Sequence, residues 1–441
     1  MRHKSSLLRG AALGALIALG IGAGAQAKTY STSEAARIQA LEAQVQALTD
    51  RLDAQANAAL DAQTAARQAQ EAAQQTKAAA DAQIKTIPAQ VQTAVAALPK
   101  PKPGWEASTS VSGRMYYNIS NINMKSNGVK PTGSPNGTNF DLKRFYIGVD
   151  HKFNDTFSGN VTADVTYDSG PVANTQFFVK KAYLQAKFSD AAVLRLGSAD
   201  LPWVPFAEDM YGYRYIENTI ADRTKFATSA DWGVHFGGKL PAGMATINYQ
   251  FAVLNGAGYK KPGIGTGNRS KGVDFEGRVS ANVSDFVVGV GGYTGKLGKD
   301  VQGVTTYNTA QRFNVLAAYK GKRATLGGEY FYASNWNDVT NAGAANSSEG
   351  YSVFGSYKFA DKFSVFGRYD WVKPKRDTAS TLEDNYFNVG VSYSPAKIVD
   401  FALVYKRDKV DHGTLSTSNG TIGGSIDGTY DEIGLWSQFR W

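Results

Sequence analysis

The chain has 441 residues, a formal net charge of +9 at pH 7 and no cysteine. The lack of thiols excludes a disulfide framework and a cysteine-based metal site, and the moderate charge does not by itself indicate a nucleic-acid partner. The 46 Gly, 23 Tyr and 22 Phe are typical of a large all-β domain with many turns and bands of aromatic side chains.

Residues 1–27 have the features of a signal peptide. A basic start is followed by an apolar core at 11–23, too short to span a membrane, and by the small-residue cleavage site Ala25-Gln26-Ala27. A stop-transfer anchor is the alternative, but the next segment is polar. Cleavage would remove three of the 47 Lys and Arg, leaving 44 against 38 acids and a mature charge near +6. Later segments never reach ~18 consecutive apolar residues, so a membrane crossing would require a barrel.

Residues 28–98 are predicted to form a periplasmic helical segment. Apolar residues at spacings of 3 and 4 indicate a coiled-coil seam, which a helix buries only against another helix. The seam residues are Ile38, Leu41, Val45, Leu48 and Leu52. Beyond them the pattern weakens, and we expect Pro88 to interrupt the helix. The alternative is a lone solvated helix. Residues 99–104 are predicted to be a stiff proline-rich linker.

From residue 105 to 441 the apolar period changes to two, which predicts a transmembrane β-barrel. In 157–167 the odd positions are mainly apolar and the even positions polar, so that one face meets hydrocarbon and the other water. An even number of such segments fits an antiparallel single-chain barrel. The sixteen predicted strands are 111–119, 144–153, 157–167, 181–188, 192–199, 231–240, 245–253, 273–283, 285–293, 312–320, 323–332, 351–359, 363–371, 386–393, 398–406 and 431–441.

The connections between these segments alternate between short and long. Six tight turns are expected, whereas long polar connections are expected at 120–139, 201–229, 254–270, 294–311, 333–350, 372–385 and 407–430. Sorting of loop lengths by side is typical of an outer-membrane barrel. A soluble sandwich is the alternative, although its loops need not sort in this way.

The connection 201–229 is unusually long and aromatic. We expect it to fold inward and to form the constriction of a water-filled hole, because long loops within a regular array usually have a function. A solvated surface excursion is the alternative. The predicted constriction residues are Arg144, Arg195, Arg214, Arg223, Lys225, Glu208, Asp209, Glu217 and Asp222.

Basic side chains predominate on the polar faces of the predicted strands. Such an excess would raise the local anion concentration, since a low-dielectric wall focuses the field. Each of these bases could equally be a solvated lumen residue without a selective role. The predicted lumen-lining residues are Arg114, Lys181, Arg278, Arg312, Arg323 and Arg368.

The last residues alternate up to the terminal position itself. Phe439 and Trp441 place aromatic rings at the end of the final predicted strand. Such an end resembles the C-terminal assembly signal of outer-membrane proteins, so we expect its truncation to harm insertion more than conduction.

Several landmarks between residues 140 and 256 resemble the phosphate-selective porin O/P family. They are Arg144–Val149, Phe178–Ala186, Leu194–Gly197, Pro202, Pro205-Phe206 and Asp231–Val234. The resemblance implies a trimeric sixteen-stranded channel whose third loop folds into the lumen. Members also carry a ladder of lumenal arginines and a lysine-rich throat. Here the third loop has four acids beside three bases, so phosphate selectivity does not follow from the resemblance.

The sequence therefore predicts a sixteen-stranded outer-membrane porin with an N-terminal coiled coil. We expect a diffusion channel for small hydrophilic solutes and ions with a modest anion preference, no enzymatic activity, no cofactor and no metal. Expected partners are outer-membrane lipid and further copies in a homotrimer, with no nucleic acid. An outer-membrane protease or lipase is one alternative, but the histidines lack metal-ligand spacing. A structural protein whose coiled coil tethers the membrane to peptidoglycan is the other.

Overall fold

The computed structural model describes residues 32–97, 104, 106–167, 175–261, 269–343 and 345–441. The predicted signal peptide and residues 99–103 of the predicted linker lie outside the described residues. The chain divides into two compact units, residues 1–100 and 101–441, and each is considered by itself.

The first unit contains one α-helix of 66 residues, α1 (Thr32–Ala97). Its seam side chains are exposed, from 45% for Ile38 to 65% for Leu52. The helix continues through Pro88, so the expected interruption there is wrong. A proline removes one backbone hydrogen bond and can bend a helix without ending it. Within the described chain, no helix has both the length and the apolar composition needed to cross a membrane.

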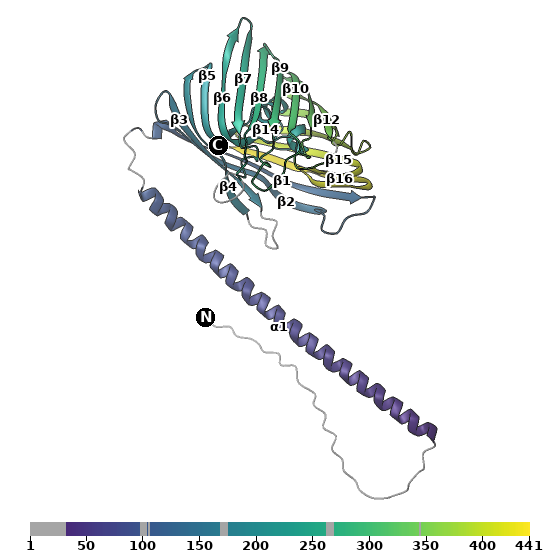
Figure 1. The fold of residues 1–441 in the computed structure, drawn as a ribbon. Coiled ribbons are helices and arrows are strands. Elements are labelled where there is room, and N and C mark those ends of the chain that lie inside the picture. The colour runs from purple at the N-terminus through teal and green to yellow at the C-terminus, as the bar shows by residue number, and fades with distance from the viewer. Residues whose placement is uncertain (1–31, 98–103, 105, 168–174, 262–268, 344) are drawn as a thin grey trace. The chain divides into compact units, whose positions relative to one another are not determined.

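The second unit is a closed barrel of sixteen antiparallel strands, each paired with its neighbours in sequence (Figure 1). The short 3₁₀ helix η1 (Glu106–Ser108) precedes the first strand. β1 closes the barrel on β16, with Arg114 opposite Arg440 and Ser126 opposite Gly428. The strands are β1 (Thr109–Ser126), β2 (Gly137–Lys152), β3 (Phe157–Tyr167), β4 (Thr175–Ser189), β5 (Ala192–Asp200), β6 (Ala230–Ala242), β7 (Ala245–Leu254), β8 (Asp274–Val283), β9 (Phe286–Gly295), β10 (Ala310–Lys320), β11 (Ala324–Ser334), β12 (Ser347–Ala360), β13 (Phe363–Lys373), β14 (Glu383–Ala396), β15 (Val399–Thr417) and β16 (Gly420–Arg440).

Alternation of side chains explains the barrel. On β3, Val161 is 53% exposed on the outer face, whereas its neighbours Asn160 and Thr162 are buried on the inner face. An outer wall of apolar side chains suits hydrocarbon, and closure leaves no strand edge unpaired. The predicted sixteen-stranded fold is confirmed.

Two of the expected long connections are wrong. The predicted loop 407–430 is mostly strand, since β15 and β16 extend to a turn at Ser418 and Asn419. In the same way β1 and β2 shorten the predicted loop 120–139 to residues 127–136. Polar side chains occur on both faces of these extensions, so the alternation that marks a membrane strand is lost although cross-strand hydrogen bonding continues. The tight turn between β6 and β7 was also missed.

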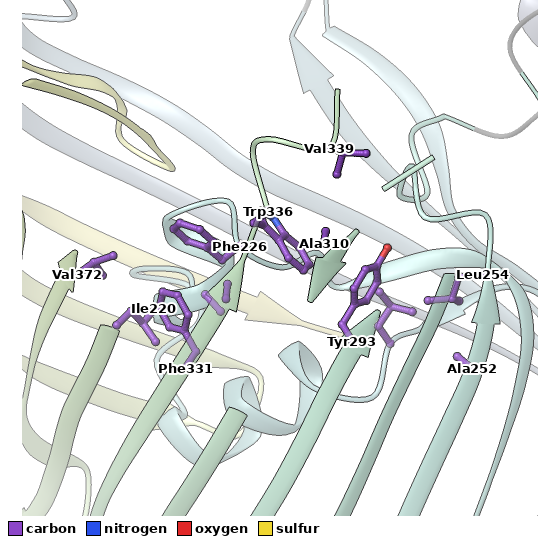
Figure 2. Packing of buried hydrophobic residues seen from close by; sticks show 13 residues of the cluster. Ile220, Phe226, Ala252, Leu254, Tyr293, Ala310, Phe331, Trp336, Val339 and Val372 are labelled. Atoms are coloured by element: carbon purple, nitrogen blue, oxygen red, sulfur yellow. The ribbon is translucent and has the colours of Figure 1, made fainter. Parts of the chain in front are cut away.

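The connection 201–229 contains two short helices, α2 (Val204–Tyr211) and α3 (Ile220–Arg223). Figure 2 shows Ile220 and Phe226 of this connection packed beside Phe331 and Trp336, which belong to β11 and the residues after it. Other strands add Leu254, Tyr293 and Val372 to the same cluster. The buried core of the barrel therefore forms around residues 201–229, and we call this connection the inner loop.

Candidate functional site

The inner loop turns sharply because of local sequence signals. Pro205 lies in the first turn of α2, where a missing backbone N–H costs nothing. The helix ends at Gly212, which adopts φ +78°, a left-handed conformation that glycine reaches without strain. These signals fold residues 204–211 into a compact element that fits inside the barrel.

Trp203 anchors the start of the inner loop. Its side chain is fully buried, its backbone N–H donates to Glu276 at 3.1 Å, and its indole Nε1 donates to Glu329 at 2.6 Å. A Cβ at Gly291 of β9 would lie 2.5 Å from the Trp203 ring. The glycine therefore leaves the space into which the indole packs.

Arg223 anchors the end of α3 through three carboxylates on three successive strands. Its guanidinium lies 3.0 Å from Asp370, 2.6 Å from Asp384 and 3.0 Å from Asp408, and all four side chains are fully buried. Arg368 adds a second pair to Asp370 at 2.6 Å and donates to the carbonyl of Asn218. Because the guanidinium of Arg223 pairs with a buried carboxylate on each strand, this cluster fixes the loop against β13, β14 and β15.

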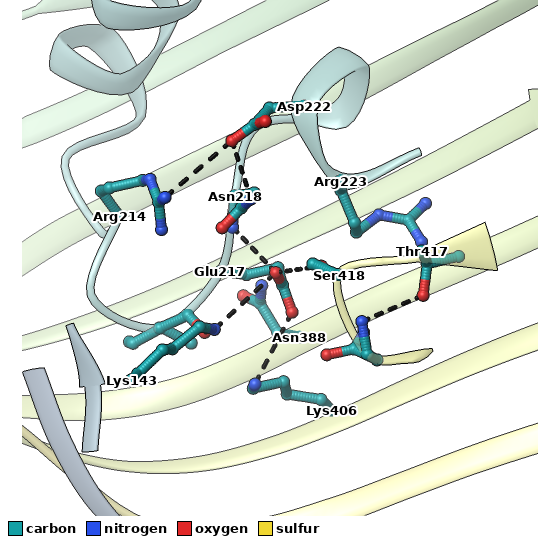
Figure 3. A network of polar contacts seen from close by, with 12 residues as sticks. Lys143, Arg214, Glu217, Asn218, Asp222, Arg223, Asn388, Lys406, Thr417 and Ser418 are labelled. Carbon is teal, nitrogen blue, oxygen red and sulfur yellow. Dashed lines mark hydrogen bonds and ion pairs between the residues drawn. The ribbon is translucent and has the colours of Figure 1, made fainter. Parts of the chain in front are cut away.

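Glu217 forms the second ionic anchor (Figure 3). Its carboxylate lies 3.8 Å from Lys143 and 3.6 Å from Lys406, and accepts a hydrogen bond from the Ser418 hydroxyl at 2.6 Å. Burial alone would raise the pKa of Glu217, but the two ammonium groups and the hydrogen bonds hold that pKa well below its usual range. The inner loop is thus tied to β2, to β15 and to the turn that follows β15.

Four of the five remaining charged residues of the inner loop are also partnered. Arg214 donates a hydrogen bond to Glu208 and lies 3.9 Å from Asp222. The charge of Arg214 is therefore compensated by two carboxylates of the inner loop itself. Asp209 pairs with Lys320 of β10 at 3.0 Å. Lys225 is exposed and adopts φ +66°.

The other two predicted constriction bases lie on the wall. Arg144 of β2 pairs with Asp164 at 3.0 Å. Arg195 of β5 donates to Gln185 at 2.9 Å and has its guanidinium 5.3 Å from the Tyr183 ring. The structure thus gives the predicted bases separate partners: Arg223 contacts β13 to β15, whereas Arg195 contacts β4.

Five of the predicted lumen-lining bases lie on the inner face of strands. Lys181 pairs with Asp200 at 3.0 Å, Arg312 with Glu276 at 3.1 Å, and Arg368 with Asp370. Arg278 donates to the carbonyl of Pro202 at 2.7 Å, and Arg114 to the Tyr116 hydroxyl at 3.4 Å. Arg323 differs, because it is exposed in the turn between β10 and β11.

Two interior bases were missed because the strands contain β-bulges. An extra residue in β2 turns both Lys143 and Arg144 inward, and one in β4 does the same for Lys180 and Lys181. Lys180 Nζ lies 4.6 Å from the Tyr146 ring and 3.3 Å from its hydroxyl. Adjacent bases in a membrane strand were the available signal, since strict alternation would expose one of them to hydrocarbon.

Hollows lie on both sides of the inner loop. One of about 610 Å³ is lined by Lys143, Lys406 and Glu432 and by residues 135–139. It lies toward the long-loop rim, the end of the barrel at which the long connections join the strands. Another of about 350 Å³ is lined by Arg114, Arg214, Arg440 and Thr325. It lies near the tight-turn rim, the opposite end of the barrel, at which short turns join the strands. Charged and polar side chains reach both hollows, so both suit water and dissolved ions.

Comparison with solved structures decides the type of barrel. The chain is similar to an anion-selective porin from Comamonas acidovorans, with 14% identity and a TM-score of 0.55 over 76% of this chain and 99% of that one. The outer membrane channel DcaP of Acinetobacter baumannii gives 12% identity and a TM-score of 0.52, over 76% and 97%. OmpT, an outer-membrane protein of Vibrio cholerae, gives 15% identity and a TM-score of 0.51, over 76% of this chain and 97% of that one.

The chain has the fold of a bacterial porin. At these identities the likeness concerns the porin fold alone. No protein-family model matches the chain, and no curated protein matches its sequence. The phosphate-selective porin O/P family therefore stays a resemblance.

Proposed function

We propose that this porin-like barrel is a diffusion channel for small hydrophilic solutes and ions in the bacterial outer membrane. The observation that carries the proposal is a closed barrel with an apolar outer wall, a polar inner wall and a loop packed inside it. A barrel of sixteen strands is wide enough to leave an aqueous path. Purified protein added to a planar lipid bilayer should produce stepwise increases in conductance.

The inner loop is the constriction of this channel. It is fixed at Trp203, Glu217 and Arg223, and hollows lie on either side of it. A solute that crosses the barrel must pass beside the loop, so the loop sets the limiting width. Because the loop is held by buried ion pairs, the channel has a fixed rather than a fluctuating bore.

The preference of the channel is for anions, and it is modest. Arg223 lies against three carboxylates and Arg214 against two, so neither arginine contributes a net positive field. Several interior bases, among them Lys180, Arg195 and Arg278, have partners that are rings, amides, hydroxyls or carbonyls instead of carboxylates. Their uncompensated charge favours anions, and added salt screens it over a distance of ~10 Å at 0.1 M.

Assembly into a homotrimer, with the helical segment in the periplasm, completes the proposal. The family resemblance implies the trimer, and the exposed seam of α1 supports association of the helices. Chemical crosslinking of detergent-solubilised protein should yield a trimer band. A ladder without a limit at three copies would contradict this assembly.

A second candidate function uses the same helix. A helix of 66 residues with a one-sided apolar seam is not required for diffusion, and it could bind the cell wall or another periplasmic partner. Co-sedimentation with purified peptidoglycan, compared with protein lacking residues 28–98, tests this tether. Equal sedimentation of the two proteins would exclude it.

A further inference from the structure

A third hollow of about 450 Å³ lies on the inner wall between β4 and β8, close to the tight-turn rim. It is separate from the two hollows beside the central part of the inner loop. Its lining includes the polar side chains Gln185, Lys187, Arg195, His235, Lys239 and Arg278. We call it the basic pocket.

Positive charge is in excess in the basic pocket. Four cationic side chains line it against a single carboxylate, Asp190, which is already paired with Lys187 at 2.7 Å. The formal balance is therefore +3 with a neutral histidine. Low-dielectric walls strengthen such a charge relative to bulk water.

The two arginines of the basic pocket are held in place by neutral partners. The Arg195 Nε donates to the side-chain amide oxygen Oε1 of Gln185 at 2.9 Å. Arg278 donates to the carbonyl of Pro202 at 2.7 Å and has its guanidinium 4.4 Å from the Phe206 ring. Because a guanidinium has five N–H groups, each arginine is oriented by these contacts and keeps donors for another acceptor.

His235 gives an independent indication of a ligand. It lies directly opposite Arg195 on the neighbouring strand, lines the pocket and is only 2% exposed. Neither ring nitrogen makes a hydrogen bond of good geometry in the part of the chain that the structure describes, although the backbones of Asp231 and Gly197 lie close to the ring. A buried polar group normally finds a partner, and an imidazole N–H on the strand position opposite Arg195 suits an oxygen acceptor of negative charge.

We propose that the basic pocket binds a small oxyanion, of the carboxylate or phosphate type, as it passes the tight-turn side of the barrel. Arg195, Arg278 and Lys239 supply the charge, and His235 supplies a neutral donor. The proposal rests on the channel function above, because the pocket opens on the barrel interior. The basic pocket is then a specific binding site for the oxyanion, in addition to the general positive electrostatic field of the lumen.

Titration of oxyanions against the current of a small salt tests the pocket. Membranes containing the protein in 0.1 M potassium chloride receive sodium phosphate in one series and sodium acetate in another. A bound oxyanion should reduce the chloride current, and the more effective anion identifies the preferred class. The concentration for half reduction should be at least fivefold higher in R195Q/K239Q than in the unsubstituted protein, and about two- to threefold higher in H235N.

Lys358→Gln is the matched control, since Lys358 is another exposed lysine near the tight-turn end of a strand but outside the pocket. It should leave the half-reduction concentration unchanged. An equal concentration in R195Q/K239Q and the unsubstituted protein, or no effect of either oxyanion, would overturn the proposal. A reversal potential without anion preference on the same membranes would instead contradict the proposed selectivity, while the titration still decides the pocket.

Discussion

At the scale of single residues, Arg223 holds the inner loop most directly. Replacing it by methionine leaves three buried carboxylates with only Arg368 nearby, and removal of one partner from a buried ion pair costs roughly 3–5 kcal/mol. We expect R223M to free the loop while the barrel remains. Single-channel conductance should rise and become noisy, with heat-modifiable gel migration retained.

Arg376→Met is the control for this substitution. Arg376 pairs with Glu349 at 3.2 Å, but both side chains are partly exposed. Such pairs contribute ~0–1 kcal/mol, so conductance should be unchanged. A quiet, unaltered conductance in R223M as well would show that the cluster does not hold the loop.

The lowered pKa of Glu217 predicts how the loop responds to acid. A carboxyl whose pKa is lower in the folded protein stabilises it above its ordinary pKa of ~4.3, and this contribution is lost as the pH falls toward the lower folded value. Conductance should therefore stay constant from pH 7 to pH 5. In E217Q, Lys143 loses its carboxylate partner, and we expect an altered conductance already at pH 7.

Glu349→Gln, which removes a partly exposed carboxylate, should behave as the unsubstituted protein at every pH. If the unsubstituted channel changed between pH 7 and pH 5 and E217Q did not, the assignment of Glu217 as a permanently charged anchor would be wrong.

The partners of Arg223 could not all be predicted from the sequence. Arg223 was predicted as a constriction residue, but Asp384 and Asp408 fell in segments that were expected to be loops. The extension of β15 beyond residue 406 has polar side chains on both faces, so alternation does not identify it as a strand. The sequence therefore did not show that Asp408 points into the barrel. Pairing across 161 and 185 residues of sequence depends on strand register, which alternation alone does not specify.

At the scale of elements, Gly291 on the inner face of β9 is predicted to control loop docking. A valine at Gly291 would displace the Trp203 ring, and overpacking of this kind costs ~1–3 kcal/mol. We expect G291V to expose the loop, so that limited trypsin digestion cuts after Arg214 or Lys225. Its neighbour Gly292 is the control, because a Cβ there meets only the carbonyl of Arg312, at 3.3 Å. Equal digestion of G291V and G292V would contradict the docking role.

The helix α1 makes a separate prediction. Leu41 and Leu48 are about 60% exposed, so a single helix gains little from them. In L41D/L48D we expect loss of helix association, with a lower helical signal in circular dichroism and intact barrel trimers. Substitution of the exposed Gln46 and Ala54 by aspartate provides a charge-matched control off the seam. Dissociation of the trimer in L41D/L48D would make the helix the principal contact.

The strands themselves were largely predictable and their irregularities were not. Alternation located all sixteen strands because hydrocarbon and water face opposite sides of the wall. The bulges at Lys143 and Lys180 break the period by one residue, and no turn signal marks them. Alternation therefore predicts the wall of the barrel better than its charged lining.

At the scale of the whole molecule, an inner loop whose arginines are paired with carboxylates lies inside a wall that carries bases with neutral partners. In the proposed channel, the loop sets the width of the hole, and wall bases without carboxylate partners set the preference for anions. The sequence-based expectation also derived an anion preference from wall bases, but it placed the loop bases Arg214, Arg223 and Lys225 with Arg144 and Arg195 at the constriction. The division between loop and wall predicts that charge removal on the wall changes selectivity, whereas substitution of loop anchors changes conductance.

The reversal potential in a potassium chloride gradient is the most direct test of the proposed channel and of its anion preference. We expect a potential of the sign given by a modest excess of chloride over potassium permeability, and we expect it to decrease as both salt concentrations are raised. A potential of the opposite sign, or membranes that stay non-conducting with correctly folded protein, would contradict it.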